Sequence, residues 1–367
     1  LLALILGLCM VLALAGCASE TETEGSEAGT TAKTEAAEET ASGQTEEETL
    51  GETLEETAQE TGEGQSAEGQ DGTVIRIGSL SGPTSMGLVS LMEKNENGEA
   101  QGSYEFTMAT AADEINASFL RGDLDIVLIP ANVASVLYNR TEGEAVVLDI
   151  NTLGVLYLLE SGDSIQSVAD LEGRTIYLPG RGTTPDYALQ YVLAQNGLTT
   201  EDVDLQYKAE AAEVISALAE EPDAVGLLPQ PAVTTALMQN DSLRIALDLT
   251  EEWDKVSQDS SLVTGVTVVN RTFLEENEAA VQTFIAEHQE SAAYANENVE
   301  EAAQLVAQLG IVPQAAIAAQ AIPYCNITCL TGGEMQTALS GYLEVLFGQN
   351  AESVGGALPG DDFYYMP

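Results

Sequence analysis

Short apolar runs alternate with longer stretches of helical periodicity between Thr73 and residue 270. Runs rich in Val, Ile and Leu predict strands, whereas apolar positions three and four residues apart predict helices. The alternation predicts an α/β fold with two mostly parallel sheets flanked by helices, followed by a helical C-terminus. The predicted strands are residues 73–80, 103–109, 125–130, 145–150, 174–179, 203–207, 224–228, 243–249 and 262–269. The predicted helices are residues 86–95, 112–121, 132–139, 185–196, 211–220, 231–239, 272–297, 299–309, 313–321 and 333–348.

An apolar segment without a polar face occupies residues 1–16 and ends at Cys17. It is short for a membrane-spanning helix, and it fits the core of a secretion signal whose basic start and initiator Met are missing. We therefore expect the sequence to be truncated at its start. Leu14-Ala15-Gly16-Cys17 resembles the lipobox of bacterial lipoproteins, in which cleavage leaves a diacylated cysteine at the new N-terminus. The resemblance implies a signal peptide over residues 1–16 and a lipid anchor on Cys17.

The segment over residues 17–72 is strongly acidic and almost without large apolar residues. Residues 18–72 carry 17 acidic residues, 11 Thr and a single basic residue, Lys33. Such a composition cannot bury enough apolar surface to offset the entropy lost on ordering, so a disordered tether is predicted. A specific acidic interaction tail is the alternative.

The chain as a whole is strongly anionic. Its 367 residues include 60 Asp and Glu against 11 Lys and Arg, which gives a formal net charge of −49. That balance argues against binding to nucleic acid or to an anionic membrane surface. One His and four Cys leave few ligands for a zinc or haem site, and the sequence has no Gly-x-x-x-x-Gly-Lys-Ser/Thr phosphate motif. We therefore expect no metal and no cofactor.

The loops after the predicted strands carry small and polar residues. Ligands of open α/β sheets bind at the carboxyl ends of strands, where the first N–H groups of helices are free. The strand at 73–80 is followed by Ser81-Gly82-Pro83-Thr84, and the strand at 174–179 by Gly180-Arg181-Gly182-Thr183-Thr184. The remaining loops contain Thr110, Pro130-Ala131-Asn132 and Gln230. Each loop alone is also consistent with an ordinary helix cap, but one binding cleft would collect all of them.

Five stretches, taken in order, resemble one protein family. They are IRIGSLSGPTSMGLVSLME (75–93), GDLDIVLIPANVASVLYN (122–139), TLGVLYLLE (152–160), VADLEGRTIYLPGRGTTPDYAL (168–189) and GLLPQPAV (226–233). The segment DLEGRTIYLPGRGTTP is the most specific, because the family opens its second lobe with an Asp-Leu-x-Gly-Lys/Arg strand and a Gly-rich helix start. Residues 73–367 thus resemble a type II periplasmic binding protein of the nitrate, sulfonate, taurine and thiamine-precursor group of ABC-transporter substrate-binding proteins.

The resemblance implies two lobes that close over a ligand as rigid bodies, with residues 73–160 and 262–367 in lobe 1 and residues 161–261 in lobe 2. It implies a monomeric, lipid-anchored receptor on the extracytoplasmic face of a bacterial membrane, which captures a small solute for an ABC permease. Tyr157 and Trp253 are candidate aromatic walls of the site, with packing in the core as the alternative. Ligand contacts are expected from Ser81, Gly82, Pro83, Thr84, Thr110, Pro130, Ala131, Asn132, Asn151, Thr152, Arg181, Gly182, Thr183, Thr184 and Gln230.

Three further features leave their chemistry open. Arg181 is one of ten basic residues in 73–367, and it either presents a guanidinium fork to an anion or pairs with one of 43 acidic residues. Cys325 and Cys329 form a disulfide only if the chain turns between them, and two free thiols are the alternative. His288 lies among charged residues and is predicted to be exposed to solvent. Because the sequence has no second His, no Ser-His-Asp or Cys-His catalytic arrangement is expected.

The leading hypothesis is therefore a solute-binding receptor rather than an enzyme. A ligand sensor for a membrane receptor is the second hypothesis, and an enzyme of the same fold that acts on a pyrimidine metabolite is the third. The loops do not select among sulfonates, nitrate-like anions, pyrimidines and other aromatic metabolites.

Overall fold

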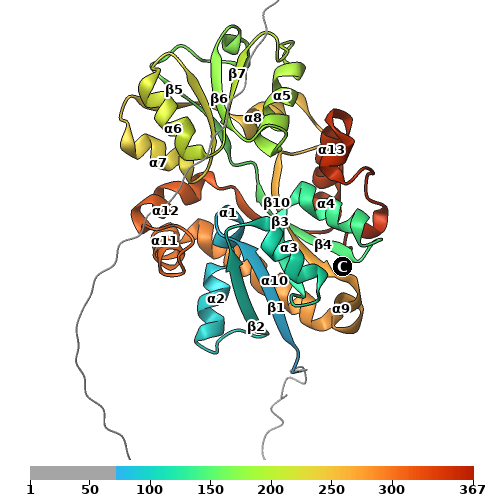
Figure 1. Ribbon diagram of the computed structural model, residues 1–367. Helices are drawn as coiled ribbons and strands as arrows, with labels where there is room; N and C mark the ends of the chain where they lie inside the picture. The colour runs from blue at the N-terminus through green and yellow to red at the C-terminus, as the bar shows by residue number, and fades with distance from the viewer. Residues whose placement is uncertain (1–71) are drawn as a thin grey trace, which may run out of the picture. The chain divides into compact units, whose positions relative to one another are not determined.

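The computed structural model describes residues 72–367, so the predicted signal peptide, Cys17 and the tether lie outside the described residues. The described chain forms two β-sheets with helices packed against them (Figure 1). The α/β class predicted from the sequence is confirmed. Among residues 72–367, no helix is long and apolar enough to cross a membrane.

The first sheet has six strands in the order β11–β4–β10–β3–β1–β2. β1 is parallel to β2 and β3, whereas β10 is antiparallel to β3 and β4, and β11 is antiparallel to β4. The strands are β1 Val74–Leu80, β2 Ser103–Ala109, β3 Ile126–Pro130, β4 Ala145–Leu153, β10 Val263–Asn270 and β11 Ile327–Leu330.

The second sheet has five strands in the order β7–β6–β8–β5–β9. β6 is parallel to β7 and β8, whereas β5 is antiparallel to β8 and β9. The strands are β5 Leu156–Ser161, β6 Thr175–Pro179, β7 Asp204–Lys208, β8 Val225–Pro229 and β9 Leu243–Asp248.

Both sheets contain more antiparallel pairs than the sequence predicts, because the chain crosses between them twice. β4, in the first sheet, ends at Leu153, and β5, the first strand of the second sheet along the chain, begins at Leu156. The chain returns after β9, and β10 starts at Val263. β4 runs toward the junction of the sheets, whereas β10 starts at the junction and runs away from it, so these two strands are antiparallel. In the second sheet, β5 starts at the junction and β8 ends there, so they are antiparallel as well.

The first crossing lies earlier than the resemblance implies. Residues up to 160 are expected in lobe 1, yet Leu156–Ser161 pairs with β8 and β9 of the second sheet. The crossing therefore falls at Gly154 and Val155. The periodicity also does not predict β11, and two predicted helices are interrupted, at Gly87 and at Asn277.

Helices cover both faces of each sheet. Apolar side chains of the first sheet pack with α2 and α10 on one face and with α3, α4 and α13 on the other. In the second sheet, α5 and α8 cover one face, and α6 and α7 cover the other. The α-helices are α1 Pro83–Met86, α2 Val89–Glu96, α3 Ala112–Leu120, α4 Ala131–Arg140, α5 Thr184–Gln195, α6 Ala211–Glu220, α7 Ala232–Gln239, α8 Leu249–Val256, α9 Arg271–Glu276, α10 Glu278–Glu297, α11 Val299–Gln308, α12 Ala315–Ala321 and α13 Gly332–Gln349. Short 3-10 helices are η1 Val168–Leu171, η2 Ile322–Tyr324, η3 Ala351–Val354 and η4 Asp361–Phe363.

Candidate functional site

The predicted ligand loops lie at the carboxyl ends of parallel strands. β1 leads through Ser81 and Gly82 into α1, and β3 leads directly into α4. In the second sheet, β6 leads into α5 and β8 leads into α7. The pairs Gly265–Pro130 and Leu156–Pro229 put the ends of β3 and β8 next to strands that start at the crossings. The loops of both sheets therefore approach the junction of the two sheets.

The loop after β1 is fixed by bonds within the first sheet. The Ser81 amide donates to the carbonyl of Ala109 (2.9 Å), which joins this loop to the one that contains Thr110. The buried Thr84 hydroxyl donates to the carbonyl of Leu80 (3.0 Å). Gly82 has φ of 132°, a backbone conformation that favours glycine. Pro83 is half-buried, and Thr110 is exposed.

Asn151 and Thr152 on β4 are buried and hydrogen-bonded. The Thr152 hydroxyl donates to Asn151 Oδ1 (2.9 Å), and Asn151 Nδ2 donates to the hydroxyl of Thr267 (3.2 Å). A Cβ on Gly265 would lie 2.5 Å from both Asn151 Oδ1 and Thr84 Cγ2. The structure thus brings Thr84 and Asn151 together beside Gly265, a residue that the sequence analysis does not single out.

Two of the residues expected to contact a ligand, Ala131 and Asn132, contact other parts of the chain. Ala131 is buried in the core that α4 shares with the first sheet. Asn132 Nδ2 donates to the backbone carbonyl of Ser353 (3.2 Å), so its amide is engaged by the C-terminal segment. Pro130 is half-buried and pairs with Gly265. Of these three residues, Pro130 is the one next to the Thr84–Asn151 contact.

The loop after β6 is ordered by one buried carboxylate. Asp186 Oδ2 accepts from the Gly182 amide (2.7 Å), and Oδ1 accepts from the Tyr207 hydroxyl (2.9 Å). Burial and this bond to Asp186 raise the pKa of Tyr207 to about 12, so the phenol remains a donor at neutral pH. Thr183 donates its hydroxyl to the carbonyl of Gly180 (2.6 Å), and Thr184 is the first residue of α5.

Two cations stand at this edge of the second sheet without an anionic partner. The exposed Arg181 guanidinium lies over the ring of Tyr207, 4.2 Å from its centroid, and forms no ion pair with any residue in 72–367. The Lys208 ammonium lies 4.7 Å from the ring centroid of Tyr177 and is likewise without an ion pair among the described residues. The Gly180 amide donates to the carbonyl of Lys208 (3.0 Å), so the two loops are adjacent. Sequence reasoning missed Lys208, although its position at the end of β7 meets the same rule as the other loops.

Gln230 follows β8 and is almost completely buried. Its Oε1 accepts from the amide and the hydroxyl of Thr234 (3.3 and 2.9 Å), whereas Nε2 has no hydrogen-bond partner among the described residues. Gln230 lines a pocket of about 360 Å³ between elements of the second sheet and the α12–η2 segment. The other lining residues are Thr234, Leu237, Ile245, Ala319, Gln320, Pro323 and Tyr324.

The two candidate aromatic walls are part of the core. Trp253 is fully buried, donates from Nε1 to the hydroxyl of Ser260 (2.9 Å), and packs against Tyr191 with ring centroids 4.2 Å apart. Tyr157 is buried and donates its hydroxyl to the carbonyl of Tyr324 (2.8 Å). Packing, the alternative interpretation, therefore describes both.

The prediction that His288 is exposed is wrong. His288 is fully buried because α10 turns Phe284, His288 and Ala292 toward the sheet at intervals of four residues. Its Nδ1 lies 3.3 Å from Asp149 Oδ2 on β4. Cys325 and Cys329 are free thiols, and burial and the nearby Asp149 raise the pKa of Cys329.

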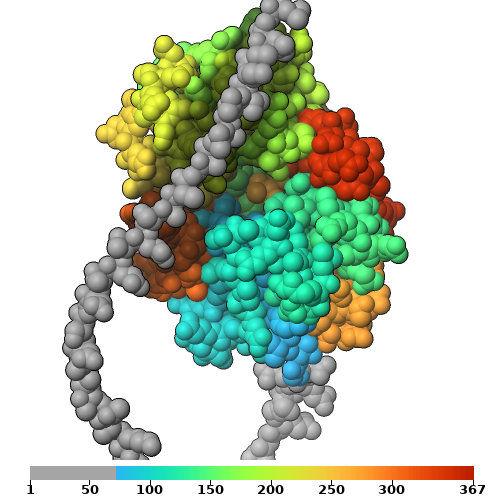
Figure 2. All heavy atoms as spheres, in the orientation of Figure 1, coloured from blue at the N-terminus to red at the C-terminus, as the bar shows by residue number. Residues whose placement is uncertain are grey.

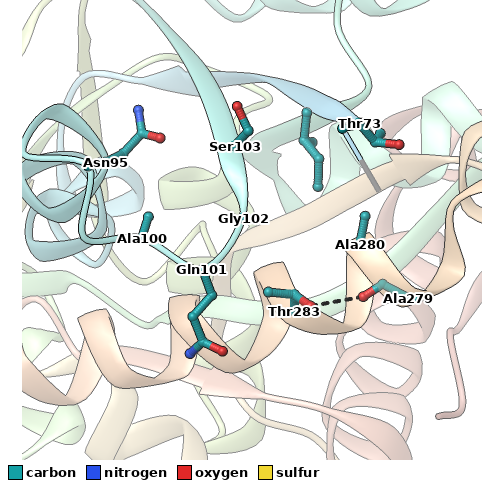
Figure 3. A pocket seen from close by; sticks show the side chains of 12 residues that line it. Thr73, Asn95, Ala100, Gln101, Gly102, Ser103, Ala279, Ala280 and Thr283 are labelled. Atoms are coloured by element: carbon teal, nitrogen blue, oxygen red, sulfur yellow. Dashed lines mark hydrogen bonds between the residues drawn. The ribbon is translucent and has the colours of Figure 1, made fainter. Parts of the chain in front are cut away.

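A second pocket, of about 520 Å³, lies away from all these loops. Figure 3 shows it at the starts of β1 and β2 beside the first turns of α10. No charged side chain lines it, and Asn95 at its rim already bonds through its amide to the backbone of Tyr104. The pocket is thus not part of the candidate site.

Comparisons with known proteins agree with this architecture. Residues 134–302 match the family model described as NMT1/THI5 like. An ABC transporter structure from Parabacteroides distasonis is similar at 24% identity and a TM-score of 0.67, over 80% of this chain and 99% of that one. The periplasmic aliphatic sulphonate binding protein SsuA from Escherichia coli is similar at 18% identity and a TM-score of 0.63, over 80% and 92% of the two chains. The alkanesulfonate-binding protein SsuA from Xanthomonas axonopodis pv. citri, bound to MOPS, is similar at 16% identity and a TM-score of 0.55, over 78% and 94%.

Among curated protein sequences, none matches the chain. The structural similarities are below 25% identity and establish the fold. The chain therefore contains an NMT1/THI5-like segment and has the fold of the periplasmic solute-binding proteins of ABC transporters.

Proposed function

We propose that the chain is a solute-binding receptor that closes two lobes over a small molecule and delivers it to an ABC importer. The observation that carries the proposal is the convergence of strand-end loops from both sheets at a junction with two crossings. In this architecture the crossings act as a hinge, and each sheet with its helices moves as a rigid body. The candidate contacts are those expected from the sequence, except that Asn132 and Ala131 serve packing.

We propose further that the solute is anionic. Four of the ten basic side chains in residues 73–367 form no ion pair with the described residues, and two of these four, Arg181 and Lys208, stand over aromatic rings at the edge of the second sheet. A guanidinium that is not engaged by a carboxylate can accept a sulfonate or carboxylate in bidentate geometry. The acidic surface repels anions at long range, but salt screens charges beyond about 8 Å at physiological ionic strength, so local cations decide binding.

We propose that this receptor is anchored through lipid on Cys17 at the extracytoplasmic face of the membrane. The acidic segment after Cys17 would act as a tether, and the receptor would meet its permease as a monomer. Binding without turnover fits the position of His288, which is fully buried on α10 beside Asp149 of β4. No cofactor and no nucleic acid enter this proposal.

A ligand screen by thermal shift tests the proposal. The purified chain is heated with sulfonates, inorganic oxyanions, pyrimidines, thiamine precursors and amino acids. A ligand that binds only the native state adds about 2.7 kcal/mol of stability at a hundredfold excess over Kd. A selective shift with an anionic compound is expected, and a selective shift with a neutral compound alone would contradict the proposed charge.

Substitutions then test the proposed cations. Arg181→Ala is expected to weaken an anionic ligand by about 10- to 100-fold, because hydrogen bonds to charged groups contribute about 1.5–3 kcal/mol. Lys208→Ala is expected to weaken it less, since a point charge lacks the bidentate fork. Arg121→Ala removes an exposed guanidinium that already pairs with Asp123 and serves as the control. An unchanged affinity of the Arg181 variant for a confirmed anionic ligand would exclude Arg181 as its anchor.

A further inference from the structure

Three side chains with metal-binding atoms meet in the interior of the first sheet. Asp149 on β4, His288 on α10 and Cys329 on β11 place one carboxylate oxygen, one imidazole nitrogen and one thiol sulfur within 4.8 Å of one another. They come from three elements far apart in the sequence, so the fold alone assembles them. The expectation of no metal rests on the small number of His and Cys residues in the sequence, whereas the fold brings the single His and one Cys together with a buried carboxylate.

The spacing of the ligand atoms fits a tetrahedral ion. His288 Nδ1 lies 3.3 Å from Asp149 Oδ2 and 3.9 Å from Cys329 Sγ. Zinc bonds of about 2.0 Å to nitrogen and oxygen and about 2.3 Å to sulfur imply ligand separations of about 3.3–3.6 Å. The His288–Asp149 separation therefore already fits one tetrahedral ion, and the His288–Cys329 separation is slightly long, while the third separation lies within 4.8 Å and must shorten when an ion binds.

The charge of the cluster favours a cation. Asp149 and His288 are both fully buried, and no Lys or Arg among the described residues pairs with Asp149. Burial of a carboxylate without a compensating positive charge is costly. A divalent ion bound by one carboxylate, one thiolate and one neutral imidazole would leave the cluster with no net charge.

The neighbouring groups define which atoms face the ion. Thr267 donates its hydroxyl to Asp149 Oδ1 (2.8 Å), which leaves Oδ2 directed at His288 and fixes the carboxylate as an outer-shell donor does in metal sites. His288 Nε2 lies on the other side of the ring, near Gly87, and has no partner among the described residues. Nδ1 is therefore the nitrogen that is directed toward Asp149 and Cys329.

We propose that Asp149, His288 and Cys329 form a binding site for a thiophilic divalent cation of the zinc class. Thiolate and imidazole ligands favour Zn²⁺ over Mg²⁺ or Ca²⁺, which prefer oxygen. Three protein ligands leave a fourth position for water, as in open zinc sites. Cys329, on the short strand β11, is half-buried, whereas Asp149 and His288 are fully buried. The site is independent of the proposed solute receptor and stands if that function fails.

Cobalt titration of the purified chain tests the site. The chain is reduced and stripped of metal with a chelator, and Co²⁺ is then added while absorbance is followed. We expect one Co²⁺ per chain, tetrahedral d–d bands, a thiolate-to-cobalt charge-transfer band, and loss of these bands when Zn²⁺ is added. The absence of a stoichiometric charge-transfer band would overturn the proposal.

Variants assign the ligands. Outer-shell changes alone weaken metal binding about 10- to 100-fold, so Cys329→Ser and His288→Gln are expected to weaken Co²⁺ binding by more than about 100-fold. Cys325→Ala removes the second thiol of this segment, which is buried, and is expected to leave the band unchanged. A band that survives Cys329→Ser, or that is lost in Cys325→Ala, would contradict the assignment.

X-ray absorption of the zinc-loaded wild-type chain gives a test that needs no variant. One sulfur scatterer at about 2.3 Å and nitrogen or oxygen scatterers at about 2.0 Å are expected. A first shell with no sulfur would overturn the proposal even if the variants fail to fold.

Discussion

Consecutive strands on the two sides of the first crossing each bury a carboxylate, and the two are stabilised differently. Glu160 on β5 accepts from the amides of Ser164 and Ile165 and forms an ion pair with Arg244. Asp149 on β4 accepts from Thr267 and faces His288, and it forms no ion pair with a Lys or Arg of residues 72–367. Both side chains are 0% exposed. The charge of Glu160 is thus neutralised by Arg244, whereas the groups around Asp149 carry no fixed positive charge.

The strand-end loops of the two sheets also differ in how their polar side chains are engaged. In the first sheet, Thr84, Asn151 and Thr152 are buried and bonded to one another or to the backbone. In the second sheet, Arg181 is exposed and rests on an aromatic ring. We infer that changes in the first sheet affect stability first, while changes at the edge of the second sheet affect ligand affinity first.

The largest effect is expected from removing the cation beside Glu160. Arg244→Met keeps most of the aliphatic stem but leaves a fully buried carboxylate without its charged partner. Such a change typically costs 3–5 kcal/mol, and because Arg244 is one-third exposed we expect about 3 kcal/mol. Urea unfolding measures the loss. Arg121→Met breaks an exposed pair with Asp123 and should cost less than about 1 kcal/mol. Equal losses in the two variants would mean that Glu160 does not depend on Arg244.

A smaller loss of stability is expected from removing the hydroxyl that donates to Asp149. Thr267→Val has nearly the same shape but removes the hydroxyl between Asn151 and Asp149. Leaving a buried acceptor short of one donor costs about 1–3 kcal/mol. Unfolding is measured with a chelator present, so that metal binding does not add to stability. Thr267→Ser keeps the hydroxyl and should recover most of the loss; a serine variant as unstable as the valine variant would point to lost methyl packing instead.

Most of the fold could be predicted from the sequence because its elements are local. Strand β2 and helix α6 were predicted with their observed bounds, since alternation and helical spacing act within a few residues. The sheet to which a strand belongs is not a local property. The apolar run of β5 predicts a buried strand in either sheet, and only its pairing with β8 and β9 assigns it. Strand β11 is four residues long and exists through its partner β4.

The candidate site could be predicted in part for the same reason. The rule that ligands bind at strand ends finds the loops, but whether a loop side chain is available depends on distant partners. Asn132 is taken by Ser353, more than two hundred residues away in the chain. His288 could have been recognised as buried from Val281, Phe284 and Ala292, which form one apolar stripe with it along α10. Charged neighbours on the other faces of the helix obscure that stripe.

The smallest expected effect is a pH dependence of the unfolding free energy that comes from Glu160 in the second sheet. Burial disfavours the charged form of Glu160, but bonds from Ser164 and Ile165 and the charge of Arg244 outweigh it and lower the pKa of Glu160 below its ordinary 4.5. A carboxylate with a lower pKa in the folded state contributes stability that is complete above its unfolded pKa and is lost as the pH falls through the folded value. The free-energy gap between the wild-type chain and Glu160→Gln should therefore be constant above about pH 6 and narrow below pH 4.5, as urea unfolding at several pH values would show. Asp163 also reaches Arg244 but is 85% exposed, so the gap to Asp163→Asn should stay near zero at every pH. If the difference in unfolding free energy between the wild-type chain and Glu160→Gln stays the same from about pH 6 to about pH 2, protonation of Glu160 does not affect stability and the prediction is wrong.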